Sequence, residues 1–292
     1  MNSKLIDWLI FIILSIIWGS SFVLMKEGLL NLTAYQVASL RIISSGLVLL
    51  PVAYKSYKQI PRNKILYTFL SGTLGSLLPA YLFCIAEERI DSALAGVLNS
   101  LTPIFVIIVG ALFFQSKTSL NKVIGIIIAL TGTILLFFSQ PGFSTNSNAV
   151  DVLLIVLATI MYGININMVR RYLHDIPSIQ IASLALFLNA IPALVVLYFT
   201  GYFNKDFLTH GVLVSTAYSF LLGICGTAIA SVIFYMLIKR AGAVFSSMVT
   251  YAIPLVAIIW GVIYGEKIGW KQVASLVIIL AGVWVANKKG KI

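Results

Sequence analysis

Charged residues are scarce in this sequence. Only 10% of its 292 residues are Asp, Glu, Lys or Arg, whereas an ordinary soluble domain has about 25%. Hydrophobic residues make up 60% of the chain, and its mean hydropathy is +1.02. This composition argues against an ordinary soluble domain, and it places the protein in the membrane class.

Residues that form metal sites and disulfides are also few. The two Cys, Cys84 and Cys225, lie inside apolar runs, and the two His, His174 and His210, lie in connectors. Neither a disulfide framework nor a metal site is indicated, and we expect no cofactor. The sequence has no GxxxxGK[ST] loop, which excludes ATP binding in the P-loop manner.

Acidic residues number only nine, and all of them fall at the ends of apolar segments or in connectors. Proton-coupled pumps usually carry a carboxylate or a His relay within the membrane, and this sequence offers none. Facilitated diffusion, exchange and coupling through residues that the sequence does not identify remain open. Glu266 is the best candidate for a coupling carboxylate; the alternative is a capped helix end or an ion pair with Lys267.

Long apolar runs dominate the sequence. A helix that spans a bilayer needs about 20 mostly apolar residues. Helices satisfy their own backbone groups within lipid, and the alternating pattern of a β-barrel is absent. We therefore predict an all-α polytopic membrane protein with ten transmembrane helices. The predicted spans are 5–26, 34–54, 65–86, 92–114, 121–139, 150–170, 178–200, 212–238, 242–264 and 270–287.

The basic residues predict the orientation of these spans. In the ten-span arrangement, 14 of the 20 Lys and Arg residues fall in connectors on one side, five fall on the other, and Arg41 lies within a span. Positively charged connectors stay in the cytoplasm, so we expect both termini there and the protein in a bacterial inner membrane. The net charge of +11 is scattered over short connectors, which argues against nucleic acid as a partner.

The first helical segment recurs later in the chain. At an offset of 144 residues, Asp7–Leu29 falls on Asp151–Leu173, and WGSSFVLMK lies over YGININMVR. The Gly-Ser-Ser notch near the N-terminus resembles a signal-peptide cleavage region. Its recurrence in the middle of the chain indicates a retained helix instead.

Further segments repeat in the same order. At an offset of 151 residues, FLSGTLG (Phe69–Gly75) matches FLLGICG (Phe220–Gly226), and Pro103 meets Pro254. We predict two five-helix repeats, residues 1–140 and 141–292. Because five is odd, the second copy enters the membrane from the opposite side. Binding sites of carriers with such inverted repeats lie near the midplane between the halves.

Several motifs resemble the EamA family of the drug/metabolite transporter superfamily. They are WGSSFV (Trp18–Val23), Arg41 within LRIISSG, ALAGVLNSLTPIFVIIVGALFF, and the stretch Met248–Val283 with Pro254, Gly265-Glu266 and Gly282. The resemblance implies a ten-helix inner-membrane carrier, often an exporter of amino acids, other metabolites or drugs. One departure is that Phe114-Gln115-Ser116 stands where the second half has Gly265-Glu266.

Polar, small and aromatic residues inside the spans are candidates for a substrate path, because polar groups within lipid should face the bundle interior. The alternatives are hydrogen bonds between helices, close packing at glycine and interfacial anchoring of aromatic rings. The candidates are Trp18, Gly19, Ser20, Ser21, Arg41, Tyr81, Asn99, Thr102, Tyr162, Asn165, Asn167, Thr250 and Tyr251.

Three of the intramembrane residues receive specific hypotheses. Arg41 lies about 9 Å deep at 1.5 Å per residue, and the repeat puts Ala185 at the equivalent position. It either binds a substrate carboxylate or is satisfied by backbone carbonyls or by nearby acidic residues. Pro103 and Pro254 are hinge candidates because each removes a backbone donor; an inert kink is the alternative.

Together these patterns predict a secondary transporter, and the resemblance favours an exporter, of a small organic metabolite such as an amino acid or a drug. A passive channel remains an alternative. An enzyme that processes lipids in the membrane is less favoured, because no cluster of nucleophile, base or metal ligands is found. The expected partners are the substrate and the lipid bilayer. The sequence does not define the oligomeric state and is compatible with a monomer.

Overall fold

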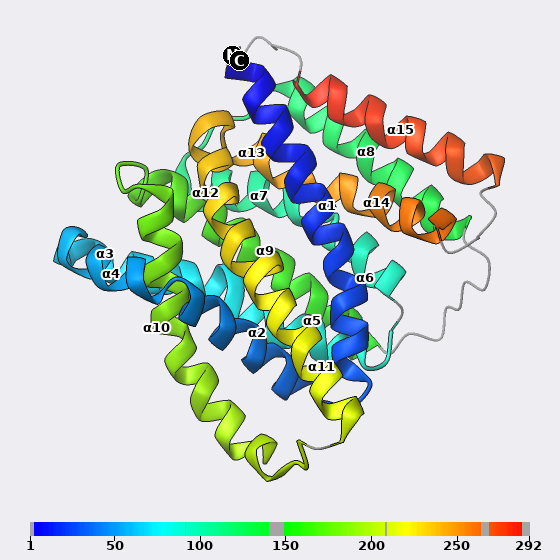
Figure 1. Cartoon of the computed structure of the whole chain (residues 1–292). Helices are drawn as coiled ribbons and strands as arrows, with labels where there is room; N and C mark the ends of the chain where they lie inside the picture. Colours follow the sequence, from blue (N-terminus) through cyan, green and yellow to red (C-terminus); the bar gives the residue numbers. More distant parts are fainter. Residues whose placement is uncertain (1–2, 91, 140–148, 208, 264–268, 288–292) are drawn as a thin grey trace.

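The structure is a computed structural model that describes residues 3–90, 92–139, 149–207, 209–263 and 269–287, and within these ranges it is built of helices without strands (Figure 1). The helices are α1 (Ser3–Leu29), α2 (Ala34–Val48), α3 (Leu50–Gln59), α4 (Arg62–Gly72), η1 (Thr73–Leu77), α5 (Leu78–Glu87), α6 (Ser92–Asn99), α7 (Thr102–Phe114), α8 (Leu120–Phe138), α9 (Ala149–Tyr172), α10 (Ser178–Phe199), η2 (Tyr202–Asn204), α11 (His210–Leu221), η3 (Leu222–Ile229), α12 (Ala230–Ala241), α13 (Ala243–Ser247), α14 (Val249–Ile263) and α15 (Trp270–Asn287).

Eight helical stretches in the described residues are long and apolar enough to cross a membrane. The number becomes nine if α2 and α3, which meet at a bend of 68°, form one span. The predicted span 242–264 contains only a shorter apolar helix, Ala243–Val256. The all-helical prediction is therefore confirmed, whereas the count of ten spans stays a prediction.

Several predicted spans are interrupted rather than straight. The span 92–114 breaks between α6 and α7, and Pro103 lies in the first turn of α7, where a missing N–H is tolerated. Thr102 Oγ1 donates to the carbonyl of Asn99 at 2.7 Å, so that carbonyl is not left free. Pro254 lies inside α14 and is the one of the two prolines that interrupts a helix interior.

A capping box fixes the start of α2. The backbone N–H of Gln36 donates to Thr33 Oγ1 at 3.4 Å, and the N–H of Thr33 donates to Gln36 Oε1 at 3.2 Å. The carboxylate of Glu88 also accepts from the N–H of Ala34 at 2.8 Å. Negative charge at a helix N-terminus is favourable, so Glu88 helps to set the position of α2.

Glycines let the two halves approach closely. A Cβ added to Gly19 in α1 would lie 2.6 Å from Val256 Cβ in α14, and one added to Gly163 in α9 would lie 2.9 Å from the carbonyl carbon of Phe105 in α7. Gly19 and Gly163 are equivalent at the offset of 144, and Phe105 and Val256 at the offset of 151. The same pair of contacts is therefore made twice, once from each half.

The last helix of each half packs against the other. A Cβ at Gly282 in α15 would lie 2.4 Å from the backbone nitrogen of Ala129 in α8, and one at Gly125 would lie 2.4 Å from the nitrogen of Ala286. In Figure 1, α8 and α15 run side by side at one edge of the bundle. Small residues at such contacts are typical of helix packing in membranes.

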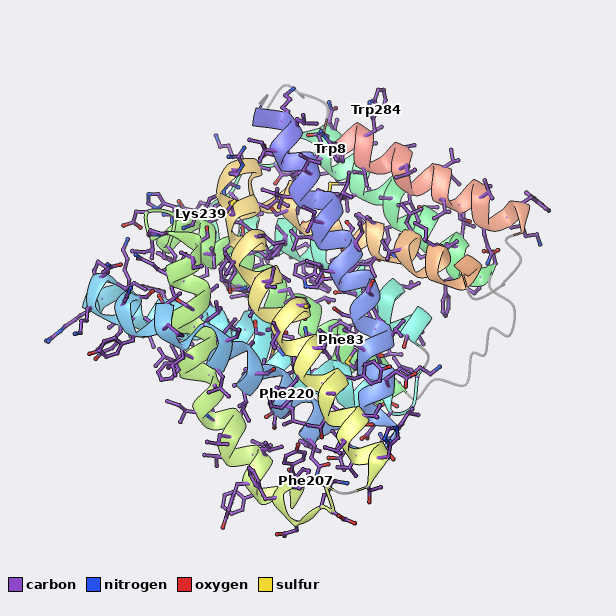
Figure 2. All side chains as sticks on the ribbon, viewed as in Figure 1. Trp8, Phe83, Phe207, Phe220, Lys239 and Trp284 are labelled. Carbon is purple, nitrogen blue, oxygen red and sulfur yellow. The ribbon has the colours of Figure 1, made fainter. Side chains whose placement is uncertain are left out.

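The exterior of the bundle is apolar. Trp284 on α15 points away from the other helices (Figure 2) and is 59% exposed, whereas Phe83 lies in the interior and is 5% exposed. Large apolar side chains are also exposed along α7 and α10, such as Phe113 and Leu194. Contiguous apolar surface of this kind suits contact with lipid.

Candidate functional site

A cavity lies between the two halves. Its empty volume is about 890 Å³ when the open solvent at its mouth is included, so the cavity has room for a small organic molecule. The lining residues are Trp18, Ser21, Phe22, Met25, Arg41, Gly75, Ser76, Phe83, Asn99, Thr102, Tyr162, Asn165, Ile166, Gly226, Thr227, Ser231, Phe234, Tyr235, Ser246, Ser247, Thr250 and Ile253.

Two π-helical segments, η1 and η3, form part of the cavity wall. Gly75 in η1 and Gly226 in η3 are equivalent at the offset of 151. A Cβ at Gly75 would lie 2.2 Å from Asn165 Nδ2, and one at Gly226 would lie 2.6 Å from Ser21 Oγ. Ser21 and Asn165 are themselves equivalent at the offset of 144. π-Helical segments occur frequently at functional sites, and here one comes from each half.

Among the residues that the structure describes, Arg41 is the one charged residue in the cavity wall. Its Nε donates to Thr227 Oγ1 in η3 at 2.7 Å. Within the described part of the chain no carboxylate lies within 4 Å of its guanidinium, and the structure gives it no other hydrogen bond. Glu88 caps α2, and Glu87 Oε2 accepts from Ser92 Oγ at 3.0 Å. The guanidinium therefore retains N–H groups that a ligand can engage.

Aromatic rings form much of the remaining wall. Trp18 Nε1 donates to the carbonyl of Gly226 at 3.1 Å, and its ring meets that of Phe234 edge-on at 4.9 Å. Phe83 and Tyr162 are stacked with centroids 6.2 Å apart. Aromatic surfaces with a few placed polar groups are typical of small-molecule sites.

Some polar side chains in the wall already have hydrogen-bond partners within the protein, and one has a buried acceptor atom without a partner. Thr250 Oγ1 donates to the carbonyl of Ser247 at 3.0 Å, and Thr102 Oγ1 bonds similarly within its own segment. Asn165 Oδ1 is buried and has no hydrogen-bond partner in the structure. A buried acceptor without a partner is unfavourable, so a ligand or a water is expected there.

Eight of the predicted path residues line the cavity, and five do not. Tyr81 OH shares a hydrogen bond of 2.7 Å with Ser39 Oγ, Asn167 Nδ2 donates to the carbonyls of Val106 and Gly163, and Tyr251 OH donates to the carbonyl of Ile126. Gly19 and Ser20 belong to α1 but not to the wall. The residues that line it are Trp18, Ser21, Arg41, Asn99, Thr102, Tyr162, Asn165 and Thr250.

The hinge and coupling candidates stand apart from the wall. Pro103 and Pro254 are not lining residues, although each directly follows one, Thr102 and Ile253 respectively. Glu266 lies outside the described residues.

Sequence reasoning missed the contributions of η3, α12 and α13. Thr227, Ser231, Ser246 and Ser247 all line the cavity. The repeat alignment gives one signal, because its matched glycines, Gly75 and Gly226, line the cavity and directly precede the wall residues Ser76 and Thr227. The other hydroxyl residues carry no distinguishing pattern in a chain that is rich in apolar helices.

The sequence model of the EamA-like transporter family matches this chain twice, over residues 6–138 and 150–288. The chain belongs to the EamA-like transporter family. A protein described as an uncharacterized transporter of Archaeoglobus fulgidus is 26% identical over 97% of this chain and 99% of its own length. The uncharacterized inner membrane transporter YedA of Escherichia coli is 26% identical over 94% of this chain and 89% of its own length.

This EamA-like protein is a multi-pass integral protein of the plasma membrane and a transporter. A solved crystal structure matches 96% of the chain and 96% of its own, with a TM-score of 0.71 and 16% sequence identity. At that identity the likeness shows the fold alone.

Proposed function

We propose that the protein is a secondary transporter that moves a small organic metabolite by alternating access between two five-helix halves, and that it works as an exporter. The observation that carries the proposal is the cavity whose wall is built from both halves, with a π-helical segment from each. Substrate sites at the interface of repeats, beside interrupted helices, are the rule in such carriers.

The paired glycine contacts support an inverted repeat. Gly19 and Gly163 make equivalent contacts, and so do Gly75 and Gly226. Contacts in which each half uses the same residues toward the other are isologous and imply a two-fold relation. With five spans in each half, the axis lies in the membrane plane. The ten-span arrangement then puts both termini in the cytoplasm.

A passive channel is the alternative within the same class of protein. It needs a continuous water-filled path and no rocking of halves, and its flux rises linearly with concentration. The membrane-enzyme alternative has less support. Within the described ranges no group of three or more His, Cys, Asp or Glu residues is placed to hold a metal ion, and no nucleophile lies beside a base in the cavity wall.

Reconstituted vesicles test the proposal. Purified protein is placed in liposomes, and uptake of candidate metabolites is measured against concentration, with and without the same compound trapped inside. A carrier gives saturating uptake that is accelerated by internal substrate. Linear uptake with no effect of internal substrate, for every compound that crosses, contradicts the proposal.

A further inference from the structure

In the described part of the chain, the cavity wall carries positive charge and no negative charge. Arg41 is half-buried in α2 and lines the cavity, and no Asp or Glu is among the lining residues. An unpaired guanidinium in such a setting is stabilised by an anion that it can bind through two parallel N–H groups. A cationic ligand would find no counter-charge there and would be repelled.

The contact to Thr227 orients that guanidinium. Nε donates to Thr227 Oγ1 at 2.7 Å, so both Nη groups remain for a ligand. Because the guanidinium is planar, fixing Nε restricts the plane in which they lie. At the equivalent position the other half has Ala185, so the cavity has a single cationic end.

The rest of the wall suits an apolar body. Trp18, Phe83, Tyr162 and Phe234 line the same cavity as Arg41. We infer that the substrate is an organic carboxylate with an apolar or aromatic body, its carboxylate bound by Arg41, and that an amine is not required. This inference rests on the proposed function and adds to it the substrate class.

Four probes that differ in one feature test the inference on the purified full-length protein. They are 3-phenylpropionate, its alcohol and amine counterparts 3-phenylpropanol and 3-phenylpropylamine, and acetate, which lacks the apolar body. Titration calorimetry measures each Kd. We expect 3-phenylpropionate to bind at least about tenfold more tightly than the other three, as a charge-assisted hydrogen bond implies.

Substitution of the guanidinium completes the test. Arg41→Gln should weaken 3-phenylpropionate about 10- to 100-fold and leave 3-phenylpropanol unchanged, while Arg41→Lys should retain part of the affinity. Arg171→Gln, which removes an exposed positive charge that bonds the carbonyl of Phe114, is the matched control and should change nothing.

Three results would overturn the inference: equal binding of the alcohol or the amine, unchanged binding of the carboxylate by Arg41→Gln, or no binding of any probe at millimolar concentration. None of these three results conflicts with saturable transport of other compounds in the vesicle assay. The substrate class and the transporter proposal therefore fail separately.

An independent observation concerns ion pairs between the halves. Arg240 at the end of α12 donates through Nε to Asp7 Oδ1 at 2.6 Å, which joins the second half to the start of α1. We call the end of the bundle where α1 begins the Asp7 face. α1 has 27 residues, so the end of α1 at this face lies about 40 Å from the other end of the helix, at 1.5 Å per residue.

The equivalent pair lies at the other end of the bundle, which we call the Asp151 face. Asp7 corresponds to Asp151 at the offset of 144, and Arg240 to Arg89 at the offset of 151. Arg89 Nη1 lies 3.4 Å from Asp151 Oδ1, and Asp151 Oδ2 is buried without a partner. The same two residue types thus join the halves at both faces, tightly at the Asp7 face and loosely at the Asp151 face.

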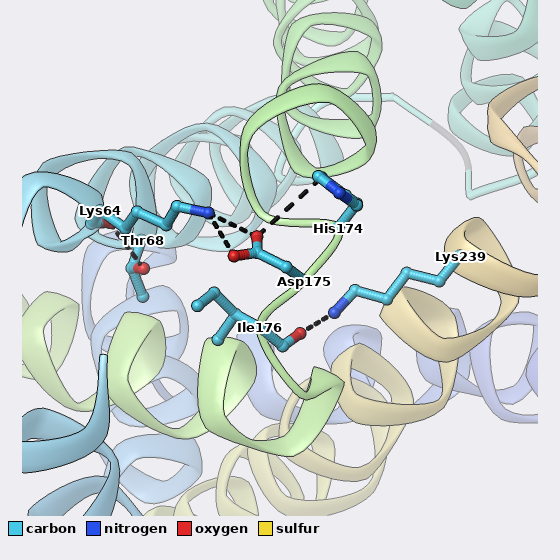
Figure 3. Close-up of polar contacts among 6 residues, drawn as sticks. All are labelled: Lys64, Thr68, His174, Asp175, Ile176 and Lys239. Atoms are coloured by element: carbon cyan, nitrogen blue, oxygen red, sulfur yellow. Dashed lines mark hydrogen bonds and ion pairs between the residues drawn. The ribbon is translucent and has the colours of Figure 1, made fainter. Parts of the chain in front are cut away.

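A second contact is repeated in the same way. Lys64 Nζ bonds both carboxylate oxygens of Asp175, the shorter distance being 2.5 Å (Figure 3). The equivalent residues, Ser215 and Asn31, are joined by a hydrogen bond of 3.1 Å from Asn31 Nδ2 to Ser215 Oγ. Among the described residues, the Asp7 face therefore has two ion pairs between the halves. The Asp151 face has one longer ion pair, the neutral Asn31–Ser215 hydrogen bond, and a hydrogen bond of 3.1 Å from Lys205 Nζ to the carbonyl of Asn31.

Lys239 connects the two contacts of the Asp7 face. It precedes Arg240 and donates to the carbonyl of Ile176, which follows Asp175 (Figure 3). The loop between α9 and α10 is thereby held by α4 on one side and by α12 on the other. Because α12 and this loop both belong to the second half, the Lys239 contact holds Arg240 and Asp175 together, and their two ion pairs to the first half break in the same movement.

We propose that these repeated contacts are the two gates of the transport cycle. In the structure the ion pairs between the halves are short at the Asp7 face, whereas the Asp151–Arg89 pair at the Asp151 face is long. In the alternate state the Asp151–Arg89 pair shortens, and the Asp7–Arg240 and Lys64–Asp175 pairs separate. An inverted repeat predicts this exchange, since each half adopts the conformation of the other.

A single reporter cysteine in the cavity wall tests the gates. Ser76→Cys is made on a Cys84→Ala, Cys225→Ala background, and a thiol reagent that does not cross membranes is applied from either side of oriented vesicles. Asp7→Asn should raise labelling from the Asp7 face and lower it from the Asp151 face. We expect changes of about two- to fivefold, the range that loss of a partly exposed ion pair allows.

Asp151→Asn should shift labelling in the opposite direction. Lys58→Gln is the matched control, because Lys58 lies over the Tyr54 ring within its own helix and joins no halves. Changes in the same direction for both Asp variants, or no change in either, would overturn the proposal. Exchange of charges in Asp7→Arg with Arg240→Asp should restore the labelling of the parent protein.

Discussion

Gly223 in η3 lies directly against the backbone of Arg41 in α2. A Cβ built on Gly223 would stand 2.3 Å from the carbonyl oxygen of Arg41 and 1.9 Å from Ser44 Oγ. The equivalent Gly72 meets the carbonyl oxygen of Ala185 at 2.6 Å in the same construction. The backbone of Arg41 is thus positioned by a glycine contact that recurs in the other half at Ala185, although Ala185 carries no charge.

The first prediction follows from this contact. Gly223→Ala should destabilise the protein by about 1–3 kcal/mol, as overpacking of a close contact does, and it should displace Arg41. Thermal unfolding of the purified protein measures the effect. Gly96→Ala is the control, since a Cβ at Gly96 meets nothing within 4 Å and alanine is the better helix former. Equal stability of both variants would contradict the close approach.

A pair of asparagines on α9 should separate packing from binding. Asn167 Nδ2 ties α9 to α7 through the carbonyl of Val106 at 2.9 Å, so Asn167→Ala should lower stability by about 0.6–1.7 kcal/mol. Asn165 lines the cavity with a free acceptor, so Asn165→Ala should change the KM of transport with little loss of stability. Thermal unfolding and vesicle uptake distinguish them, and the opposite assignment of effects would refute this reading of the site.

Thr227 should act on anion binding through Arg41. Thr227→Val keeps the shape but removes the oxygen that accepts from Arg41 Nε, and we expect about 3- to 10-fold weaker binding of 3-phenylpropionate. Thr227→Ser retains the hydroxyl and should bind nearly as the parent does. Calorimetry compares the two variants; equal affinities would show that Thr227 does not position the guanidinium.

The Lys64–Asp175 contact has a defined dependence on pH. The hydrogen bond and charge of Lys64 hold the pKa of the exposed Asp175 carboxyl below its ordinary value of 3.8. A lowered pKa means that the contact stabilises the fold above the unfolded-state pKa and is lost as the pH falls through the folded-state value. The difference in unfolding temperature between the parent and Asp175→Asn should therefore be constant above about pH 5 and shrink below pH 3.8. A difference that grows in acid would contradict this.

The helical class follows from the sequence, because composition and hydrophobic runs are one-dimensional signals; the site residues stay a prediction. Trp18, Ser21 and Arg41 are polar or aromatic residues inside apolar segments, and they line the cavity. Tyr251 and Asn167 fit the same pattern, yet their polar atoms bond backbone carbonyls of neighbouring helices. Sequence spacing does not say which face of an interrupted helix turns inward.

The sequence pattern also does not predict where the helices within a span are interrupted. Pro103 pointed to an irregularity, but the separation of α6 from α7 and the π-helical turns depend on contacts between distant segments. Serines such as Ser246 and Ser247 reach the cavity because α13 is a separate short helix. The pairing of Asp7 with Arg240 likewise needs the fold, since 233 positions separate them.

The most direct test of alternating access is to lock one face. Asp7→Cys and Arg240→Cys are introduced together on the background without Cys84 and Cys225. A short bis-methanethiosulfonate reagent, which replaces the reach of the lost Arg240 side chain, should bridge the two thiols through disulfides, because the parent side chains are in contact. Uptake into vesicles is measured before cross-linking, after it and after reduction. We predict that cross-linking stops uptake and that reduction restores it. Undiminished uptake by protein shown to be cross-linked would contradict alternating access between the halves.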